Sequence, residues 1–323
     1  MSPVRSRRLA ALLPAFAAVA LVVAACGGSA ATPAPSASPA PTAQPSPVGP
    51  EPTPGDPTPV IPTPSPNPEG QTYWLRITTT QALAPEYVFG NAPMLVITGD
   101  GLAVMAGAVP AIYPGPLVMP LFSRQVSEAG REKIVAWAKE LGLLAGKTDF
   151  HGEPGTIGGG LPGGISGMIE LTVDGERIAL TGPMGIAAEN PSPGSAEAFG
   201  TFWNRLLDLS GSLGAEVGPE TPYTPAGYSV LIGPVSAEAA QLQQPMADWP
   251  LEVGPGSFGS PVAGGAFRCG TATGADAAAL GQAFAKANQL TPWVEGPETS
   301  ATFGLTVRQL TPGEDACREI FGG

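Results

Sequence analysis

The sequence is poor in the residues that build metal and catalytic centres. Its 323 residues contain one histidine, three cysteines and four lysines, and only 13% of residues are charged. A single histidine excludes the common zinc sites that use two or more histidines. No serine lies in a GxSxG motif, and any serine triad would have to use His151. We therefore expect no metal and no cofactor.

Two glycine-rich segments match phosphate-binding loops only formally. Residues 158–163 read GGGLPG, but Pro162 interrupts the motif and strand-like residues follow where a helix is needed. Residues 142–148 read GLLAGKT, which is one residue short of a P-loop and follows a helical pattern instead of a strand. Both segments are expected to be loops.

Basic residues are scarce, and the chain is acidic. The net charge is −12, and without Arg5, Arg7 and Arg8 it becomes −15. Such a charge excludes nucleic acid as a partner and argues against electrostatic binding to anionic lipid headgroups. The carboxylates are scattered along the chain, which is typical of a solvated surface.

The amino terminus carries an export pattern. The three arginines precede an apolar run, Leu9–Val23, that is short for a stable membrane span and ends at Val23-Ala24-Ala25-Cys26. An apolar residue and two small residues before a cysteine resemble the lipobox of bacterial lipoproteins, with Val23 where that family often has Leu. The resemblance implies that residues 1–25 are a signal peptide. It also implies acyl chains, palmitate among them, on Cys26, and attachment to the extracytoplasmic face of the cell membrane. The alternative is an ordinary signal peptide or an uncleaved anchor with a chance cysteine.

The remaining cysteines and the following segment agree with export. With Cys26 lipidated, Cys269 and Cys317 are left as a disulfide pair in an oxidising compartment, the alternative being two buried thiols. Residues 26–70 are expected to be a disordered tether, because Ala30–Gly70 holds fifteen prolines and almost no large apolar residue. A spacer is favoured over a peptide ligand for an aromatic groove.

The rest of the chain predicts an α+β fold of antiparallel β-hairpins with helices packed on one face. Residues 71–215 form one domain, and residues 226–323 form a smaller α+β region with the disulfide, separate from or continuous with the first. Strands are predicted at 73–80, 94–98, 102–106, 121–126, 165–173, 177–181, 228–232 and 302–310. Helices are predicted after Ser127 and Ser195, where apolar residues recur at helical spacing, and near 276–288.

Two groups of residues are weak site candidates. Asp149, His151 and Glu153 alternate, so an extended segment would place all three side chains on one face, where they could bind a cation or act as an acid and base. A solvated loop is the favoured alternative. Trp249 and Trp293 lie between prolines in predicted loops, where exposed tryptophans can anchor a sugar or a protein, although such residues more often close a core.

The sequence therefore predicts a location more firmly than an activity. The layout of lipobox, proline-rich spacer and modest α+β head resembles exported lipoproteins of high-GC bacteria. The favoured function is a non-enzymatic protein that binds or scaffolds an envelope protein or glycan. One alternative is a cell-envelope hydrolase that uses paired carboxylates, which needs no sequence motif. A purely structural head is another.

Overall fold

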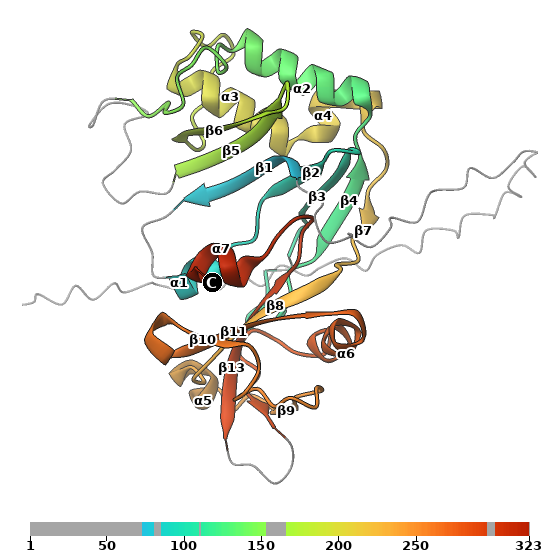
Figure 1. The fold of residues 1–323 in the computed structure, drawn as a ribbon, viewed down its shortest axis with the longest axis vertical. Helices are drawn as coiled ribbons and strands as arrows, with labels where there is room; N and C mark the ends of the chain where they lie inside the picture. The colour runs from blue at the N-terminus through green and yellow to red at the C-terminus, as the bar shows by residue number, and fades with distance from the viewer. Residues whose placement is uncertain (1–72, 81–84, 110, 153–165, 296–300, 323) are drawn as a thin grey trace, which may run out of the picture. The chain divides into compact units, whose positions relative to one another are not determined.

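Residues 73–222 build a seven-stranded antiparallel sheet in the computed structural model, which describes residues 73–80, 85–109, 111–152, 166–295 and 301–322 (Figure 1). The strand order is β6-β5-β1-β2-β3-β4-β7. The strands are β1 (Tyr73–Thr80), β2 (Leu95–Thr98), β3 (Leu102–Ala106), β4 (Leu121–Gln125), β5 (Ser166–Val173), β6 (Glu176–Pro183) and β7 (Thr221–Pro222). The β5–β6 hairpin turns at Asp174 and Gly175, whose φ angles of 52° and 85° suit a two-residue turn.

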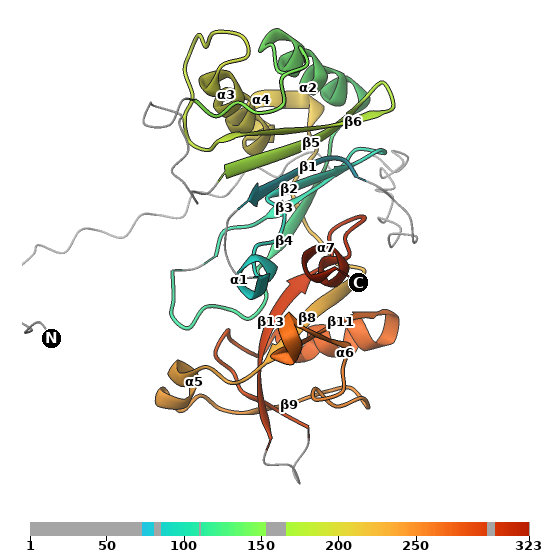
Figure 2. The same ribbon diagram turned by 60° about the vertical axis from the view of Figure 1, so that its left-hand side comes forward.

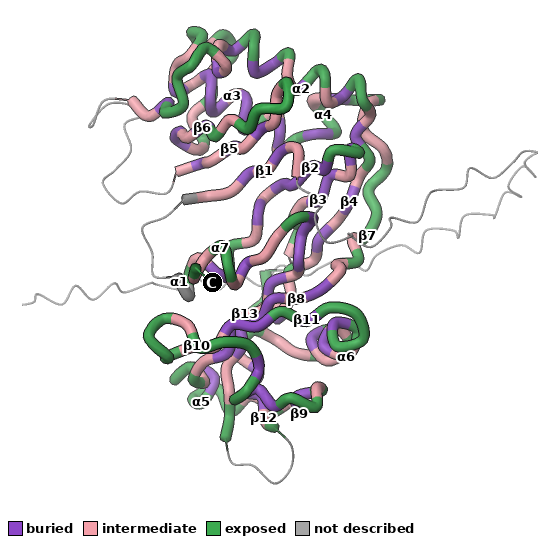
Figure 3. The backbone as a smooth tube through the Cα atoms, in the orientation of Figure 1, coloured by how far each residue is buried: buried purple, intermediate pink, exposed green. Residues whose placement is uncertain are grey.

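Helices cover one face of this first sheet. In Figure 2, α2 (Glu128–Glu140) and α3 (Ala196–Leu207) lie on the same side of β5 and β6. Ser127 and Ser195 cap them, each accepting a hydrogen bond from the backbone N–H three residues on. The main core lies between these helices and the sheet, where Figure 3 shows buried stretches in β1, β2 and α3.

Glycines allow the rings of α3 to approach the sheet closely. A Cβ at Gly182 would lie 2.6 Å from the ring of Phe199, and one at Gly167 would lie 2.5 Å from the ring of Trp203. The aromatic rings therefore pack directly on the backbone of β5 and β6. The short α4 (Leu209–Leu213) follows α3 and buries two leucines in the same core.

Residues 227–309 form a second, six-stranded sheet in the order β10-β11-β8-β13-β12-β9. Its strands are β8 (Gly227–Gly233), β9 (Ala247–Asp248), β10 (Ser260–Val262), β11 (Phe267–Thr273), β12 (Trp293–Val294) and β13 (Thr302–Gln309). Only the two-residue pair β9–β12 is parallel among the named strand pairs. Helix α6 (Gly274–Phe284) packs on this sheet through Leu280 and Phe284, and α5 (Ala237–Gln241) follows β8.

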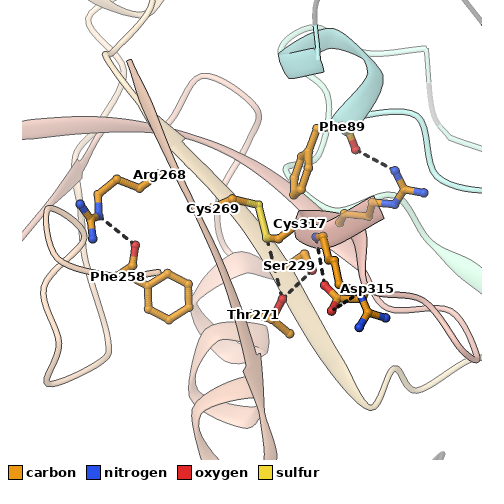
Figure 4. The surroundings of a disulfide bond; sticks show 10 residues. Phe89, Ser229, Phe258, Arg268, Cys269, Thr271, Asp315 and Cys317 are labelled. Carbon is orange, nitrogen blue, oxygen red and sulfur yellow. Dashed lines mark hydrogen bonds and ion pairs between the residues drawn. A yellow bond between two sulfur atoms is a disulfide. The ribbon is translucent and has the colours of Figure 1, made fainter. Parts of the chain in front are cut away.

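A disulfide fixes the last helix to the second sheet. Cys269 in β11 is bonded to Cys317 in α7 (Ala316–Phe321), with the Cα atoms 5.6 Å apart (Figure 4). Helix α7 also packs against α1 (Pro85–Phe89), where the rings of Phe89 and Phe321 are 6.1 Å apart. The predicted pairing of the two cysteines is therefore present in the fold.

The α+β prediction is confirmed, with antiparallel sheets and helices packed on a sheet face. The chain passes from the first sheet to the second between Pro222 and Gly227, close to the interval between the two predicted regions, 71–215 and 226–323. All described residues belong to one compact unit, Ile61–Gly323. The predicted signal peptide and tether, the lipidated Cys26, and the 158–163 loop lie outside the described residues. Within the described ranges, no helix is long and apolar enough to cross a membrane.

Trp249 and Trp293 close a core, which is the commoner role of such residues, and do not take the exposed position that a binding role requires. Their exposed fractions are 7% and 0%, because the Pro-flanked segments form β9, its following residue and β12, which pair with each other. The two indole rings meet edge to face, with centroids 6.3 Å apart, and Phe258 and Phe284 complete the cluster. Neither ring is available to stack on a sugar or a partner.

Candidate functional site

The face of the first sheet opposite α2 and α3 carries a polar cavity of about 550 Å³. Side chains alternate along a strand, so the residues of β1 and β5 that do not enter the core point to this face. Arg76 and Thr78 come from β1, and Met168 and Glu170 from β5. The remaining wall includes Asn91 after α1, Arg308 of β13 and Glu319 of α7.

Tyr73 reaches the same cavity because β1 is irregular at its start. Strict alternation would place Tyr73 on the core side with Leu75, but the pairing of β1 with β2 shifts register between these two residues. The guanidinium of Arg177 lies 4.2 Å from the centre of the Tyr73 ring and donates a hydrogen bond to the Tyr73 carbonyl. Burial, together with hydrogen bonding to Glu170, raises the pKa of the Tyr73 hydroxyl, which stays protonated at neutral pH.

Two ion pairs join the elements around the cavity. Arg76 Nη2 is 2.7 Å from Glu319 Oε2, which links β1 to α7. Arg308 pairs with Glu314, and their side chains are only 4% and 2% exposed. Arg308 also donates to the Phe89 carbonyl at 3.2 Å. Burial lowers the pKa of Arg308, whereas the pairing with Glu314 opposes that shift.

Several buried polar atoms of this wall have no hydrogen-bond partner within the part of the chain that the structure describes. They are Nε of Arg76, Nε of Arg308 and Oγ1 of Thr78. Buried donors without partners are costly, and they are usually satisfied by water or a ligand. Arg177 has no carboxylate at ion-pair distance among the described residues, so its charge is free to face a ligand.

In the described part of the chain, three further cavities do not combine ion pairs with unpartnered buried guanidinium nitrogens. One of about 420 Å³ lies along the solvent side of α2, between Trp74 and the β5–β6 turn. Another of about 340 Å³ lies on the second sheet beside Tyr87 and Phe267, and a third follows the 250–259 loop. Within the described ranges, the first of these has one such nitrogen, Nε of Arg131, but no ion pair, and the last two have neither.

The sequence candidates Asp149 and His151 are brought together at the edge of the same sheet. His151 Nδ1 is 2.6 Å from Asp149 Oδ1, which also accepts the backbone N–H of His151 at 3.0 Å. These hydrogen bonds lower the pKa of Asp149. Glu153, the third candidate, lies outside the described residues, so the shared face of the trio stays a prediction. Among the described residues, no group of three or more His, Cys, Asp and Glu side chains could hold a metal ion.

Ser166 is the residue that the sequence did not indicate. Its Oγ lies 2.8 Å from His151 Nε2, which gives a chain of contacts from Asp149 through His151 to Ser166. Fifteen residues separate the serine from the histidine, and no spacing rule connects them. Only the pairing of β5 with β6 brings them together.

No family model, curated protein or solved structure matches this chain. Any proposal about function therefore rests on the geometry and chemistry of these residues.

Proposed function

We propose that this protein is a lipid-anchored, extracytoplasmic binding protein of the cell envelope. In this proposal Cys26 carries the lipid and residues 26–70 hold the head away from the membrane. The disulfide between Cys269 and Cys317 supports it, because such bonds persist in oxidising compartments and this one leaves Cys26 as the remaining cysteine.

The head binds a small anionic ligand in the cavity on the open face of the first sheet. The observation that carries this step is a set of three arginines in one wall: Arg76, which is partly buried, Arg308, which is buried, and Arg177, which is exposed. The mature chain would hold only twelve basic residues, so three of them around one cavity is a marked concentration. Glu319 and Glu314 neutralise two of the three, which leaves Arg177 to pair with a ligand carboxylate or phosphate.

The size and lining of the cavity suit a small molecule better than a polymer. About 550 Å³ falls in the range of ligand pockets, roughly 300–1,000 Å³. The phenol of Tyr73 and the aliphatic Met168 and Ile320 give apolar surface, while the unpartnered Nε atoms and Thr78 Oγ1 give directed polar contacts. The expected ligand therefore combines an anionic group with a short apolar body.

Isothermal titration calorimetry of residues 61–323 with citrate, inorganic phosphate and glutamate tests the binding step. We expect at least one of these probes to saturate with a Kd below about 1 mM. Arg177→Gln removes the free cation and is expected to weaken that binding by roughly 10-fold or more. Arg124→Gln, at the exposed Arg124–Glu220 ion pair, is the matched control and should leave the Kd unchanged. No saturation with any of the three probes, or equal Kd values for both variants, would overturn the ligand assignment.

The anchoring step has its own test in a bacterial host. The full chain is expected to fractionate with membranes, and Cys26→Ala should release it or block its processing. Equal membrane association of the Cys26→Ala variant would reject lipid anchoring.

A further inference from the structure

The contacts of His151 have the arrangement of a nucleophile, a base and an orienting carboxylate. Asp149 Oδ1 accepts from the Nδ1 side of the ring at 2.6 Å, and Ser166 Oγ lies 2.8 Å from Nε2. A carboxylate at Nδ1 fixes the proton on that nitrogen, which leaves Nε2 as the acceptor for the serine hydroxyl proton. This is the geometry required of an activated serine, whatever the fold or the order along the chain.

Backbone pairing and core packing hold the segment that supplies Asp149 and His151. Phe150 N donates to the Thr181 carbonyl at 2.7 Å, and Thr181 N donates to the Thr148 carbonyl at 2.8 Å, so this segment runs beside β6. Phe150 is fully buried and stacks on Phe199 with ring centres 5.9 Å apart. The flanking Asp149 and His151 are therefore attached to a rigid element, as a preorganised site requires.

Ser166 is placed by the pairing of β5 with β6. It lies opposite Pro183, two residues beyond Thr181, which is the residue that bridges to Asp149. The serine therefore lies on one side of β6 and the Asp149–His151 segment lies on the other side. Both are near the end of β6 that contains Thr181 and Pro183.

The contacting residues Asp149, His151 and Ser166 also lie next to the cavity. Ser166, Met168 and Glu170 alternate along β5 and share the face opposite α3, and the last two line the cavity wall. Two residues of a strand span about 6.6 Å, so Ser166 is one side-chain position beyond the wall formed by Met168. A ligand whose anionic group lies at the arginines can extend an acyl group toward Ser166.

We propose that Ser166 is the nucleophile of a hydrolytic activity that acts on small esters, with His151 as general base and acid. The roles of Ser166 and His151 are inferred from their own contacts, and only the anionic character of the substrate rests on the proposed function. This activity differs from a paired-carboxylate mechanism, since a single carboxylate orients the histidine and none attacks the substrate.

The reaction balances with water as the co-reactant. Ser166 Oγ attacks the ester carbonyl carbon while its proton passes to His151 Nε2, and the carbon–alkoxide bond breaks as that proton moves to the leaving alcohol. Water then attacks the acyl-serine, giving one proton to Nε2. The carboxylic acid leaves, and the proton returns to Ser166 Oγ. No oxidant, metal or cofactor enters either step.

Asp149 is a positioning residue in this scheme. Its side chain is 70% exposed, whereas that of His151 is 23% exposed, so solvent screens its charge. We therefore expect slow turnover and a modest effect of Asp149→Asn relative to His151→Ala. Because Asp149→Glu retains the charge, it should recover part of the lost activity, which a merely structural loop residue would not do.

Labelling residues 61–323 with a fluorophosphonate, followed by intact-mass and peptide mass spectrometry, tests the nucleophile. We expect a single adduct on Ser166, no adduct in Ser166→Ala, and labelling at least 100-fold slower in His151→Ala. Ser257→Ala is the matched control, since this exposed serine has no histidine nearby in a chain with only one. Hydrolysis of p-nitrophenyl acetate should follow the same order.

Three outcomes would overturn the proposal. They are no labelling of the wild-type head, labelling that persists in Ser166→Ala, and a His151→Ala rate within threefold of wild type with an unchanged melting temperature. In each case the contacts of His151 serve only to hold its own segment against β5. Calorimetric binding of the anionic probes is a separate readout, so failure of labelling and failure of the cavity assignment can be told apart.

Discussion

Replacing Glu314 with glutamine tests how the cavity wall is held together. The Arg308 and Glu314 side chains are 4% and 2% exposed, so the pair is shielded from water almost completely. Glu314 Oε2 also accepts from the Thr311 hydroxyl at 2.7 Å and from its backbone N–H at 3.0 Å. Oε1 lies at ion-pair distance of Arg308.

The expected loss follows from leaving a buried guanidinium without its counter-charge. Glu314→Gln keeps the shape of the side chain and the acceptor for Thr311, but it removes the charge that Arg308 needs. Breaking a buried ion pair in this way costs about 3–5 kcal/mol. For a head of this size that equals roughly 6–20 °C in melting temperature.

Urea unfolding followed by tryptophan fluorescence, under oxidising conditions, measures this loss. Glu220→Gln is the matched control because its ion pair with Arg124 is exposed by 44% and 22%, and such pairs contribute about 0–1 kcal/mol. Adding Arg308→Met to Glu314→Gln should recover much of the stability, since a neutral pair of similar volume fits the same space. A Glu314→Gln loss no larger than that of Glu220→Gln would refute the buried pair.

Three further predictions concern stability. Cys317→Ser opens a link between residues 48 apart and should lower the free energy of unfolding by about 4 kcal/mol, as measured by urea unfolding; an unchanged midpoint would contradict the disulfide. Tyr223, whose hydroxyl donates to the Leu310 carbonyl, has a pKa raised to about 12 by burial and by Glu314. Its contribution is present below pH 10 and is lost as pH rises toward 12, so wild type should lose up to about 2.7 kcal/mol more than Tyr223→Phe between these values, and parallel pH curves would refute this. Ser127→Ala removes the cap of α2 and should cost about 1 kcal/mol, whereas a loss below about 0.3 kcal/mol in thermal unfolding would show that the cap is dispensable.

The first sheet could be predicted because its strands and turns are local signals. Asp174-Gly175 between alternating apolar residues predicts the β5–β6 hairpin, and Ser127 before apolar residues at helical spacing predicts α2. The second sheet was harder to predict from the sequence. Strand β11 reads FRCGTAT, and its small residues resemble a loop, although pairing with β8 on one side and β10 on the other makes it a strand.

The candidate site could be predicted only in part. Asp149 and His151 are two residues apart, so their contact follows from local geometry. Ser166 joins them through strand pairing, and Arg308 reaches the cavity from a strand more than 200 residues after β1. The sequence left both roles of Trp249 and Trp293 open for a related reason, since the two residues lie 44 apart and cover each other only after β9 and β12 pair. Long-range pairing leaves no trace in residue spacing.

Mass spectrometry of the mature protein, extracted from bacterial membranes after expression of the full chain, tests the central claim of lipid anchoring most directly. Lipid anchoring predicts an amino-terminal peptide that begins at Cys26 and carries a diacylglyceryl group with an amide-linked acyl chain. It also predicts a linked peptide pair that contains Cys269 and Cys317. An unmodified amino terminus at another position, with all cysteines open to alkylation, would contradict the account.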